Sequence, residues 1–479
     1  MGNSTKVPSL KKNVAYNFAY QLLALALPLV TAPYLSRIVG ADGIGVYSYS
    51  EAVATYFVYF VMLGLNNYGN RTIAACQDSK SDRTKAFWSI YAMQAVCFVV
   101  SGSAYALYCV FVPGNHVAAI LQGMFVVSAL FDVNWFFFGM ELFKLTVIRN
   151  TIVKIATTVL IFVLIKSPDD INLYIAIMSA GTLVSQVVLW PFLRRYIGFY
   201  RPRFKDVTQH IKPNLILFVS VIAISLYTTL TRILLGALGG GDAMVGYYDN
   251  ASKIASVPVA LISAIGTVML PRTSALLAKG QDSVAARNMD KTMLVMMCFA
   301  GFAAFLIPCV AEPFVELFLG PGFVIAAQAL IVLCARVPLL GFGNVMRTQY
   351  LIPHKMDSVF LVSAFCGAVA SVVVGLILIP QLGAVGAGCA SVAAEAAVLL
   401  YQSLRIGKGF PLARYLACTA SYLGGGLVMM LAVMALLPQF DNLWLDCGAN
   451  TLAAAVIYAV IAAPLTIMWA QYFKKKRVE

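Results

Sequence analysis

The sequence predicts an all-α polytopic membrane protein, and three observations support this fold class. Of the 479 residues, 61% are hydrophobic and only 11% are charged, whereas a soluble domain carries roughly 25% charged residues. Apolar stretches of about 20 residues, the length that crosses a bilayer as a helix, recur along the whole chain. The basic residues gather in short segments between these stretches.

About fourteen apolar segments are long enough to span a membrane. The first has no small-residue cleavage site after it, so we expect it to be a retained span and not a signal peptide. The expected spans are, in residue numbers, 14–37, 44–66, 86–111, 117–140, 146–165, 171–193, 213–236, 243–271, 291–311, 323–346, 358–379, 384–405, 414–437 and 447–472.

The charges between the spans predict the topology. With the N-terminus on the cytoplasmic side, only Arg37 and Lys166 among the 34 Lys and Arg residues fall in outside loops. The inside segments hold most of the others, Lys144 and Arg149 among them. This alternation is what the positive-inside rule predicts for an even number of spans with both termini in the cytoplasm.

A repeat divides the chain into two halves. The segment LTRILLGALGGGDAMVGYYDNASK at 230–253 resembles LSRIVGADGIGVYSYSE at 35–51, and each predicts a helix end, a glycine turn and a helix start. The basic segment 194–212 lies between them and is the longest inside link. We therefore expect a six-helix lobe at 1–193, a cytoplasmic linker at 194–212, a six-helix lobe in parallel repeat at 213–405, and two additional helices with a basic tail at 406–479.

A polar stripe follows one face of the first span. Asn13, Asn17 and Gln21 stand four residues apart, with Tyr16 and Tyr20 beside them. Such spacing places the side chains on one face of a helix. The stripe lines a water-filled cavity, or it hydrogen-bonds to a neighbouring helix.

Ionisable residues inside spans face a protein interior or an aqueous cavity, so they are candidate functional residues. Asp132 and Lys154 fall in the fourth and fifth spans, where they form either a structural pair or part of a site. Asp249 and Lys253 are spaced i, i+4 on the eighth span, which suits an ion pair on one helix face.

Further charges lie in the second half and at the span ends. Arg336 is expected in the tenth span and Glu395 in the twelfth. Glu395 either bridges to Arg336 or, if unpaired, takes up a proton and carries it. Arg37 and Arg232 stand at equivalent places in the two repeat copies, near the outer side, and Glu51 opens the second span.

Several functional classes are disfavoured. The ten Cys are scattered singly, without a Cys-x-x-Cys or Cys/His cluster, so we expect no disulfide and no metal site. The net charge of +14 is spread over short loops, which argues against a nucleic-acid partner. No segment is expected to form a soluble domain with an active site, and we expect no organic cofactor and no enzyme activity.

The opening KNVAYNFAYQLL, followed by LPLVTAPYLSRIVGADGIGVYSYS, and the later LGALGGGDAMVGYYDNASKI resemble the Wzx-type oligosaccharide flippases of the multidrug/oligosaccharidyl-lipid/polysaccharide exporter superfamily. The resemblance covers essentially the whole chain. It implies a bacterial inner-membrane protein that moves an undecaprenyl-pyrophosphate-linked oligosaccharide to the outer leaflet by alternating access. It also implies coupling to a Na⁺ or H⁺ gradient and possible partnership with a polysaccharide polymerase and other assembly proteins.

The resemblance and the charges together assign provisional roles. Lys154, Arg336 and Lys253, together with the polar stripe of the first span, are expected to line the substrate cavity. Arg37, Arg232 and Glu51 are expected at an outer gate. Asp249, Glu395 and Asp132 are the candidates for ion coupling.

Three other functions are considered. A drug or cation antiporter of the same superfamily tends to carry a carboxylate in the first span, and 14–35 has none. A lipid II flippase tends to carry basic residues within its first helix, where this chain has only Arg37 at the outer end. A membrane glycan polymerase or ligase would need a large external loop, which the expected topology does not contain.

Overall fold

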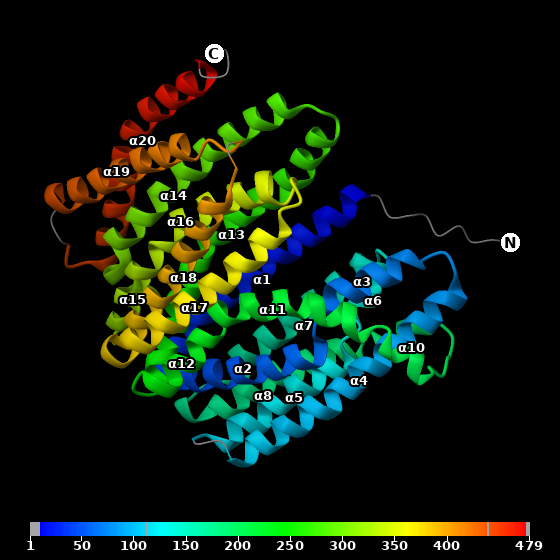
Figure 1. Cartoon of the computed structure of the whole chain (residues 1–479). Helices are drawn as coiled ribbons and strands as arrows, with labels where there is room; N and C mark the ends of the chain where they lie inside the picture. The colour runs from blue at the N-terminus through cyan, green and yellow to red at the C-terminus, as the bar shows by residue number, and fades with distance from the viewer. Residues whose placement is uncertain (1–9, 112–113, 408, 438–439, 476–479) are drawn as a thin grey trace. The chain divides into compact units, whose positions relative to one another are not determined.

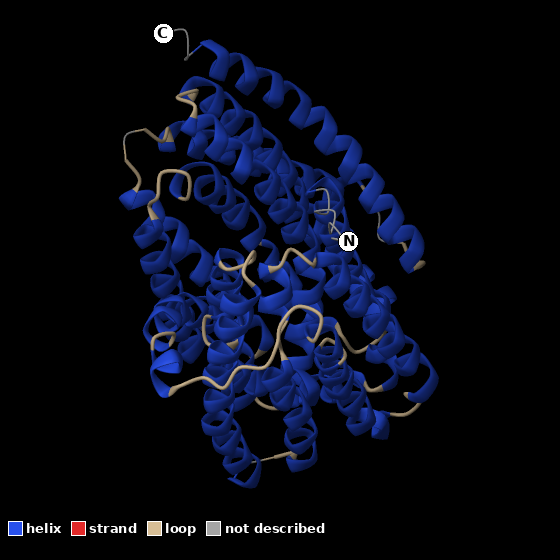
Figure 2. Ribbon diagram, turned by 90° about the vertical axis from the view of Figure 1, so that its right-hand side faces the viewer, coloured by secondary structure: helices blue, strands red, loops and turns tan. Residues whose placement is uncertain are grey.

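The computed structural model describes residues 10–111, 114–407, 409–437 and 440–475, and it describes side chains from Leu23 onward. In these ranges the chain is built of helices joined by loops and contains no strand (Figure 2). The chain divides into two compact units, Met1–Ser225 (unit 1) and Leu226–Glu479 (unit 2). The predicted all-α class is confirmed.

Unit 1 contains the helices that precede the middle of the chain. They are α1 (Leu10–Ile38), α2 (Gly40–Met62), α3 (Leu65–Ala75), α4 (Lys80–Phe111), α5 (His116–Phe131), α6 (Asn134–Gly139), α7 (Phe143–Leu164), η1 (Pro168–Asp170), α8 (Ile171–Val187), α9 (Trp190–Leu193), α10 (Phe204–Thr208) and most of α11 (Ile211–Thr228). Helix α5 packs against α2, α4 and α8, and α1 packs along α7.

Unit 2 begins at the end of α11. It contains α12 (Leu230–Leu238), α13 (Asp242–Ala278), α14 (Asp282–Leu319), α15 (Val324–Cys334), α16 (Arg336–Met346), the π-helix η2 (Arg347–Leu351), α17 (Asp357–Leu382), α18 (Ala384–Arg405), α19 (Leu412–Leu436) and α20 (Leu443–Lys475). Helices α19 and α20 lie beside α14 (Figure 1).

Twelve helical segments in the described residues are long and apolar enough to cross a membrane. They coincide with the third to fourteenth spans expected from the sequence. The first two expected spans correspond to α1 and α2, which are membrane-length helices of 29 and 23 residues. The described side chains of α1 cover only the shorter apolar stretch Leu23–Ile38, and polar residues lower the hydropathy of α2. The chain is a multi-pass membrane protein.

Three expected spans are interrupted in the structure. The seventh, expected at 213–236, breaks at Thr229 into α11 and α12. The fourth breaks after α5, where the Asp132 carboxylate accepts hydrogen bonds from the backbone and side-chain N–H groups of Asn134. An Asp side chain that captures the backbone amide two residues on favours a turn over a continuing helix. The tenth breaks at Ala335, between α15 and α16.

Both copies of the sequence repeat adopt the expected helix–turn–helix unit. Helix α1 ends at Ile38 and α2 begins at Gly40, while α12 ends at Leu238 and α13 begins at Asp242. Gly40, Gly240 and Gly241 have positive φ angles of 69°, 87° and 118°. Glycine takes up this conformation without a Cβ clash, which explains why both turns are glycine-rich.

The unit boundary falls within α11. Tyr56 of α2 donates a hydrogen bond to the Ser225 carbonyl at 3.1 Å, and the rings of Phe60 and Phe218 lie 5.4 Å apart. These contacts hold α11 against unit 1. The division predicted from the sequence, with its linker at 194–212, stays a prediction.

Close backbone approach organises the packing within each unit. Without a hydrophobic driving force between helices in lipid, small residues favour association because they let backbones approach. In unit 2, Gly367 on α17 lies so near Val398 of α18 that an added Cβ would be 2.6 Å from its Cγ2. In unit 1, a Cβ on Gly69 of α3 would lie 2.6 Å from Cε3 of the fully buried Trp135 on α6.

We therefore predict that Gly69→Ala lowers the thermal stability of the purified protein, by about 1–3 kcal/mol, because overpacking forces the rigid indole aside. The measurement is thermal unfolding in a fixed detergent. Gly102→Ala on α4 is the matched control, since its Cβ would have 3.5 Å to the nearest atom and the substitution improves helix propensity. Equal melting temperatures for the two variants would contradict the packing argument.

Candidate functional site

A cluster of three charged side chains surrounds Asp249 in unit 2. Arg232 on α12 places Nη2 3.2 Å from Asp249 Oδ1, and Lys253, one turn further along α13, places Nζ 2.7 Å from Oδ2. The Asp249 side chain is 4% exposed, while those of Arg232 and Lys253 are each 28% exposed. One buried carboxylate therefore binds two cations, one with each oxygen.

The sequence predicted part of this cluster. The i, i+4 pairing of Asp249 with Lys253 is confirmed. Arg232 was expected at an outer gate and Lys253 in the substrate cavity, and the structure brings both side chains onto Asp249. Helix α12 packs against α13, which places Arg232 beside Asp249.

Polar residues extend the cluster along the same helices. Tyr248 shares a hydrogen bond of 2.8 Å with Ser391 of α18, and Thr231 lies 3.4 Å from Ser371 of α17. Asn250, beside Asp249, is 1% exposed, and both of its amide atoms are buried without a hydrogen-bond partner in the described structure. An amide in this state is available to a polar ligand or water. Asn250 is one of the polar residues of the eighth expected span, but it was not among the expected site residues, although its position next to Asp249 was a usable signal.

A second ion pair links α16 to α18. Arg336 Nη2 lies 3.3 Å from Glu395 Oε1, with side-chain exposures of 20% and 8%. Of the two alternatives for Glu395, the structure shows the bridge to Arg336. Arg336 is the first residue of α16, so the break at Ala335 positions the guanidinium beside α18.

Among the described side chains of unit 1, Arg37 and Glu51 each form a hydrogen bond within their own helix. Arg37 is exposed and donates a hydrogen bond of 3.1 Å to the Pro33 carbonyl within α1. Glu51 accepts a hydrogen bond from Tyr47 within α2, at 3.3 Å. Lys154 lies half-buried on α7. The side chains of Asn13, Tyr16, Asn17, Tyr20 and Gln21 lie outside the described part of α1.

Asp132 ends α5, and its carboxylate orders the turn into α6. The two expected alternatives, a structural pair with Lys154 or part of a site for ion coupling, stay predictions. Next to this turn, Arg149 of α7 donates to the Ser185 carbonyl at 2.6 Å and to Asn134 Oδ1 at 3.0 Å.

Arg149 is 6% exposed, whereas the sequence reasoning assigned it to a cytoplasmic segment. The hydrogen bonds of Arg149 to Asn134 and Ser185 join α7 to α6 and α8. We therefore interpret this network as a clamp between helices.

A third carboxylate network joins α14 to α19. Tyr415 donates to Asp290 at 2.5 Å, and Arg414 Nη2 lies 3.6 Å from the same carboxylate oxygen. Both Asp290 and Tyr415 are buried. The sequence did not indicate any of these three residues as functional, because Asp290 and Arg414 fall in expected cytoplasmic segments.

The described residues contain no group of three or more His, Cys, Asp or Glu side chains that could hold a metal ion. The chemistry that the unit 2 clusters offer is ion pairing, with guanidinium and ammonium groups held by carboxylates inside an apolar bundle. An anion with several oxygens is the natural competitor for such cations.

Comparisons with known proteins match the chain over most of its length. A model of the family described as "Polysaccharide biosynthesis protein" matches residues 10–277. Two curated proteins carry the name "Putative O-antigen transporter". The one from Escherichia coli (strain K12) is 27% identical over 363 residues, covering 75% of this chain and 87% of the relative. The one from Shigella dysenteriae is 22% identical over 397 residues, covering 82% and 99%.

Solved structures share the fold. The lipid II flippase MurJ in an inward closed conformation has a TM-score of 0.71 at 13% identity, covering 98% of this chain and 99% of that one. An outward-facing multidrug resistance MATE family transporter has a TM-score of 0.51 at 15% identity, covering 85% and 94%. At these identities the likeness concerns the fold alone.

We predict that Glu395→Gln destabilises the protein by roughly 3 kcal/mol, because it leaves the Arg336 charge in an apolar bundle without its carboxylate. The double variant Arg336→Met/Glu395→Leu removes both charges and should recover most of that loss. Thermal unfolding of Glu395→Gln, the double variant and the parent in one detergent measures the difference. A double variant no more stable than Glu395→Gln would contradict the prediction.

Proposed function

The chain belongs to the polysaccharide biosynthesis protein family, and from this premise we propose that it is a flippase for a polyprenyl-pyrophosphate-linked oligosaccharide. Its cargo is a surface-polysaccharide repeat unit carried on undecaprenyl pyrophosphate, and it moves from the cytoplasmic to the outer leaflet. The family match and the two relatives named as O-antigen transporters, aligned over most of the chain, support the proposal.

The prediction that the chain is a transporter, and not an enzyme, is confirmed, because both relatives are named as O-antigen transporters. The finer topology belongs to the proposal. Helices α1 and α2 cross the membrane in addition to the twelve spans, which gives fourteen, and both termini lie in the cytoplasm of a bacterium. The strong bias of Lys and Arg toward alternate loops supports this orientation.

The observation that carries the proposal is the pair of cations on Asp249. Arg232 and Lys253 are positioned inside an apolar bundle and remain partly exposed, whereas the carboxylate that holds them is buried. Breaking a buried ion pair is costly unless another charge takes over. A pyrophosphate offers several anionic oxygens and can replace the carboxylate as partner of these cations.

Arg336 and Lys154 extend the proposed substrate path. Arg336 forms an ion pair with Glu395, as the cations do with Asp249, and Lys154 lies in the middle of α7, a candidate span. Arg37 and Glu51, in the first copy of the repeat, are proposed gate residues. The polar stripe of the first span completes the proposed lining of the cavity.

Transport proceeds by alternating access, in which the cargo headgroup occupies a central cavity and the polyprenyl chain stays in lipid. Asp249 is the proposed coupling residue, with Glu395 as the second candidate. A proton or Na⁺ that neutralises Asp249 would weaken its hold on Arg232 and Lys253 and make both cations available to the cargo. An ion gradient would in this way drive the exchange of partners.

We predict that Arg336→Ala abolishes surface polysaccharide while the protein still reaches the membrane. Surface glycan and lipid-linked repeat units are measured in a deletion strain that expresses each variant. The control is the double variant Arg336→Met/Glu395→Leu, which removes the ion pair but keeps the packing. If Arg336 binds cargo, the double variant folds and is still inactive; normal export by it would exclude Arg336 from the site.

For Asp249→Asn we expect loss of gradient-driven transport. The neutral amide cannot take up the coupling proton, and it has no negative charge to pair with the two cations. The measurement is flipping of a labelled lipid-linked oligosaccharide in proteoliposomes under an imposed H⁺ or Na⁺ gradient. Asp42→Asn on α2 serves as control, because Asp42 is exposed at a helix start. Full gradient-driven transport by Asp249→Asn would disprove the coupling role.

A further inference from the structure

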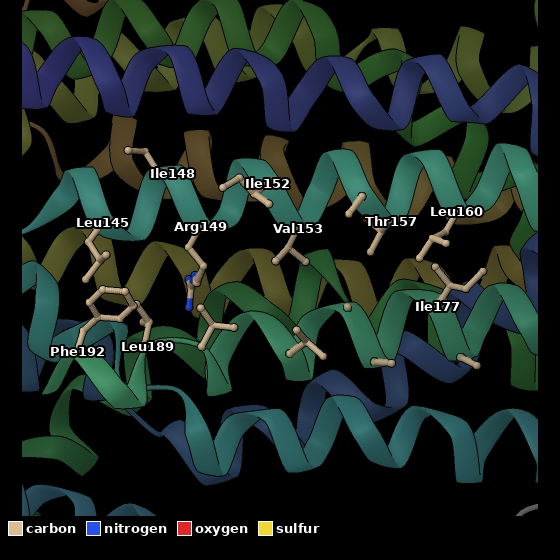
Figure 3. Close-up of a pocket in the computed structure, with 16 residues that line it drawn as sticks. Leu145, Ile148, Arg149, Ile152, Val153, Thr157, Leu160, Ile177, Leu189 and Phe192 are labelled. Atoms are coloured by element: carbon tan, nitrogen blue, oxygen red, sulfur yellow. The ribbon is translucent and has the colours of Figure 1, made fainter. Parts of the chain in front are cut away.

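An apolar groove runs between α7 and α8 on unit 1. It has a volume of about 780 Å³, within the range of roughly 300–1,000 Å³ typical of ligand pockets. On α7 its lining extends from Leu145 to Leu160, a length of about 22 Å at the rise of an α-helix. Figure 3 shows Leu145, Leu189 and Phe192 at one end and Leu160 with Ile177 at the other.

Small residues form the floor of the groove. Ala156 on α7, with Ala176, Ala180 and Gly181 on α8, belongs to the lining. A Cβ on Gly181 would overlap the Thr157 side chain, so α7 and α8 approach closely at this point. The walls stay exposed: Ile152 is 62% and Val184 54% accessible. The groove thus lies on the surface of unit 1, on a membrane-spanning helix pair, where lipid chains are the apolar molecules at hand.

Three exposed basic residues lie close in the sequence to the lining residues Leu145 and Phe192 at one end of the groove. Lys144 precedes Leu145, and Arg194 and Arg195 follow Phe192. The backbone N–H of Arg195 bonds back to the Phe192 carbonyl at 3.3 Å, which keeps this turn beside the groove. The loop charges place this end at the cytoplasmic leaflet, where anionic lipids attract Lys and Arg.

Arg149, which also lines the groove, does not contribute to this charged end. Its guanidinium is buried and donates to Ser185 and Asn134. The apolar length and the basic end are therefore separate features, supplied by different residues.

We propose that this groove binds one anionic phospholipid of the cytoplasmic leaflet. One of its two acyl chains occupies the groove between α7 and α8, and its phosphate contacts Lys144, Arg194 and Arg195. The groove is longer than the thickness of one leaflet, which is half of a hydrocarbon core about 30 Å thick. It therefore accommodates a full acyl chain. The site is a feature of unit 1 and is independent of the proposed cargo.

The test uses the full-length protein in mild detergent, with phosphatidylglycerol and phosphatidylcholine as probes, and counts bound lipid by native mass spectrometry. The parent should retain one phosphatidylglycerol in preference to phosphatidylcholine by about fivefold or more. Ala156→Phe, and independently Ile152→Trp, fill the groove and should abolish retention. Ala104→Phe, at an exposed position on α4, is the matched control and should retain lipid as the parent does.

The charge contribution is tested separately. Lys144→Gln/Arg194→Gln/Arg195→Gln should bind the two lipids equally, whereas Arg272→Gln/Lys279→Gln/Arg287→Gln, which removes the same charge from exposed positions in unit 2, should keep the preference. Parent-like retention by both groove-filling variants would overturn the proposal, as would an unchanged preference in the first triple variant. Displacement of phosphatidylglycerol by equimolar undecaprenyl phosphate would also overturn it, since the groove would then be a cargo site.

Discussion

An apolar surrounding offers no partner to a polar group, and this constraint governs the structure. Backbone groups are satisfied within helices, so the described chain is helical throughout, and each ionised side chain at depth requires a partner from the protein. Asp249 shows the constraint most clearly, because its nearly inaccessible carboxylate is bound by Arg232 and Lys253. Glu395 with Arg336 follows the same rule.

The helix breaks determine where these partners meet. Arg232 lies three residues after the break at Thr229, and Arg336 directly follows the break at Ala335. Asp132 itself forms the break between α5 and α6. A broken helix frees backbone groups and changes direction, which is tolerated at membrane depth only where the protein satisfies it. Charged residues and irregular backbone therefore occur together, and these places are suited to a change of conformation during transport.

The two units differ in how they use their charges. In unit 2 the carboxylates hold cations that remain partly exposed, so another anion can compete for them. In unit 1 the buried Arg149 donates hydrogen bonds to carbonyl and amide oxygens of neighbouring helices. The exposed Lys144, Arg194 and Arg195 lie close in the sequence to one end of an apolar groove. Because the chain belongs to the polysaccharide biosynthesis protein family, the proposed partner of the unit 2 cations is a lipid-linked oligosaccharide. The groove and basic end of unit 1 suit a phospholipid of the membrane.

Composition and periodicity by themselves determined the class of the protein, since apolar length and loop charge depend only on local sequence. They also determined the two glycine turns and the i, i+4 pair of Asp249 and Lys253, because helix geometry relates nearby residues directly. The partners of Arg232, Glu395, Asp290 and Arg149 were decided by the tertiary structure. Those contacts join side chains from different helices, and a helix break that depends on one Asp side chain or on packing leaves little trace in hydropathy. The same holds for the groove, whose floor exists only where α7 and α8 come together at Gly181.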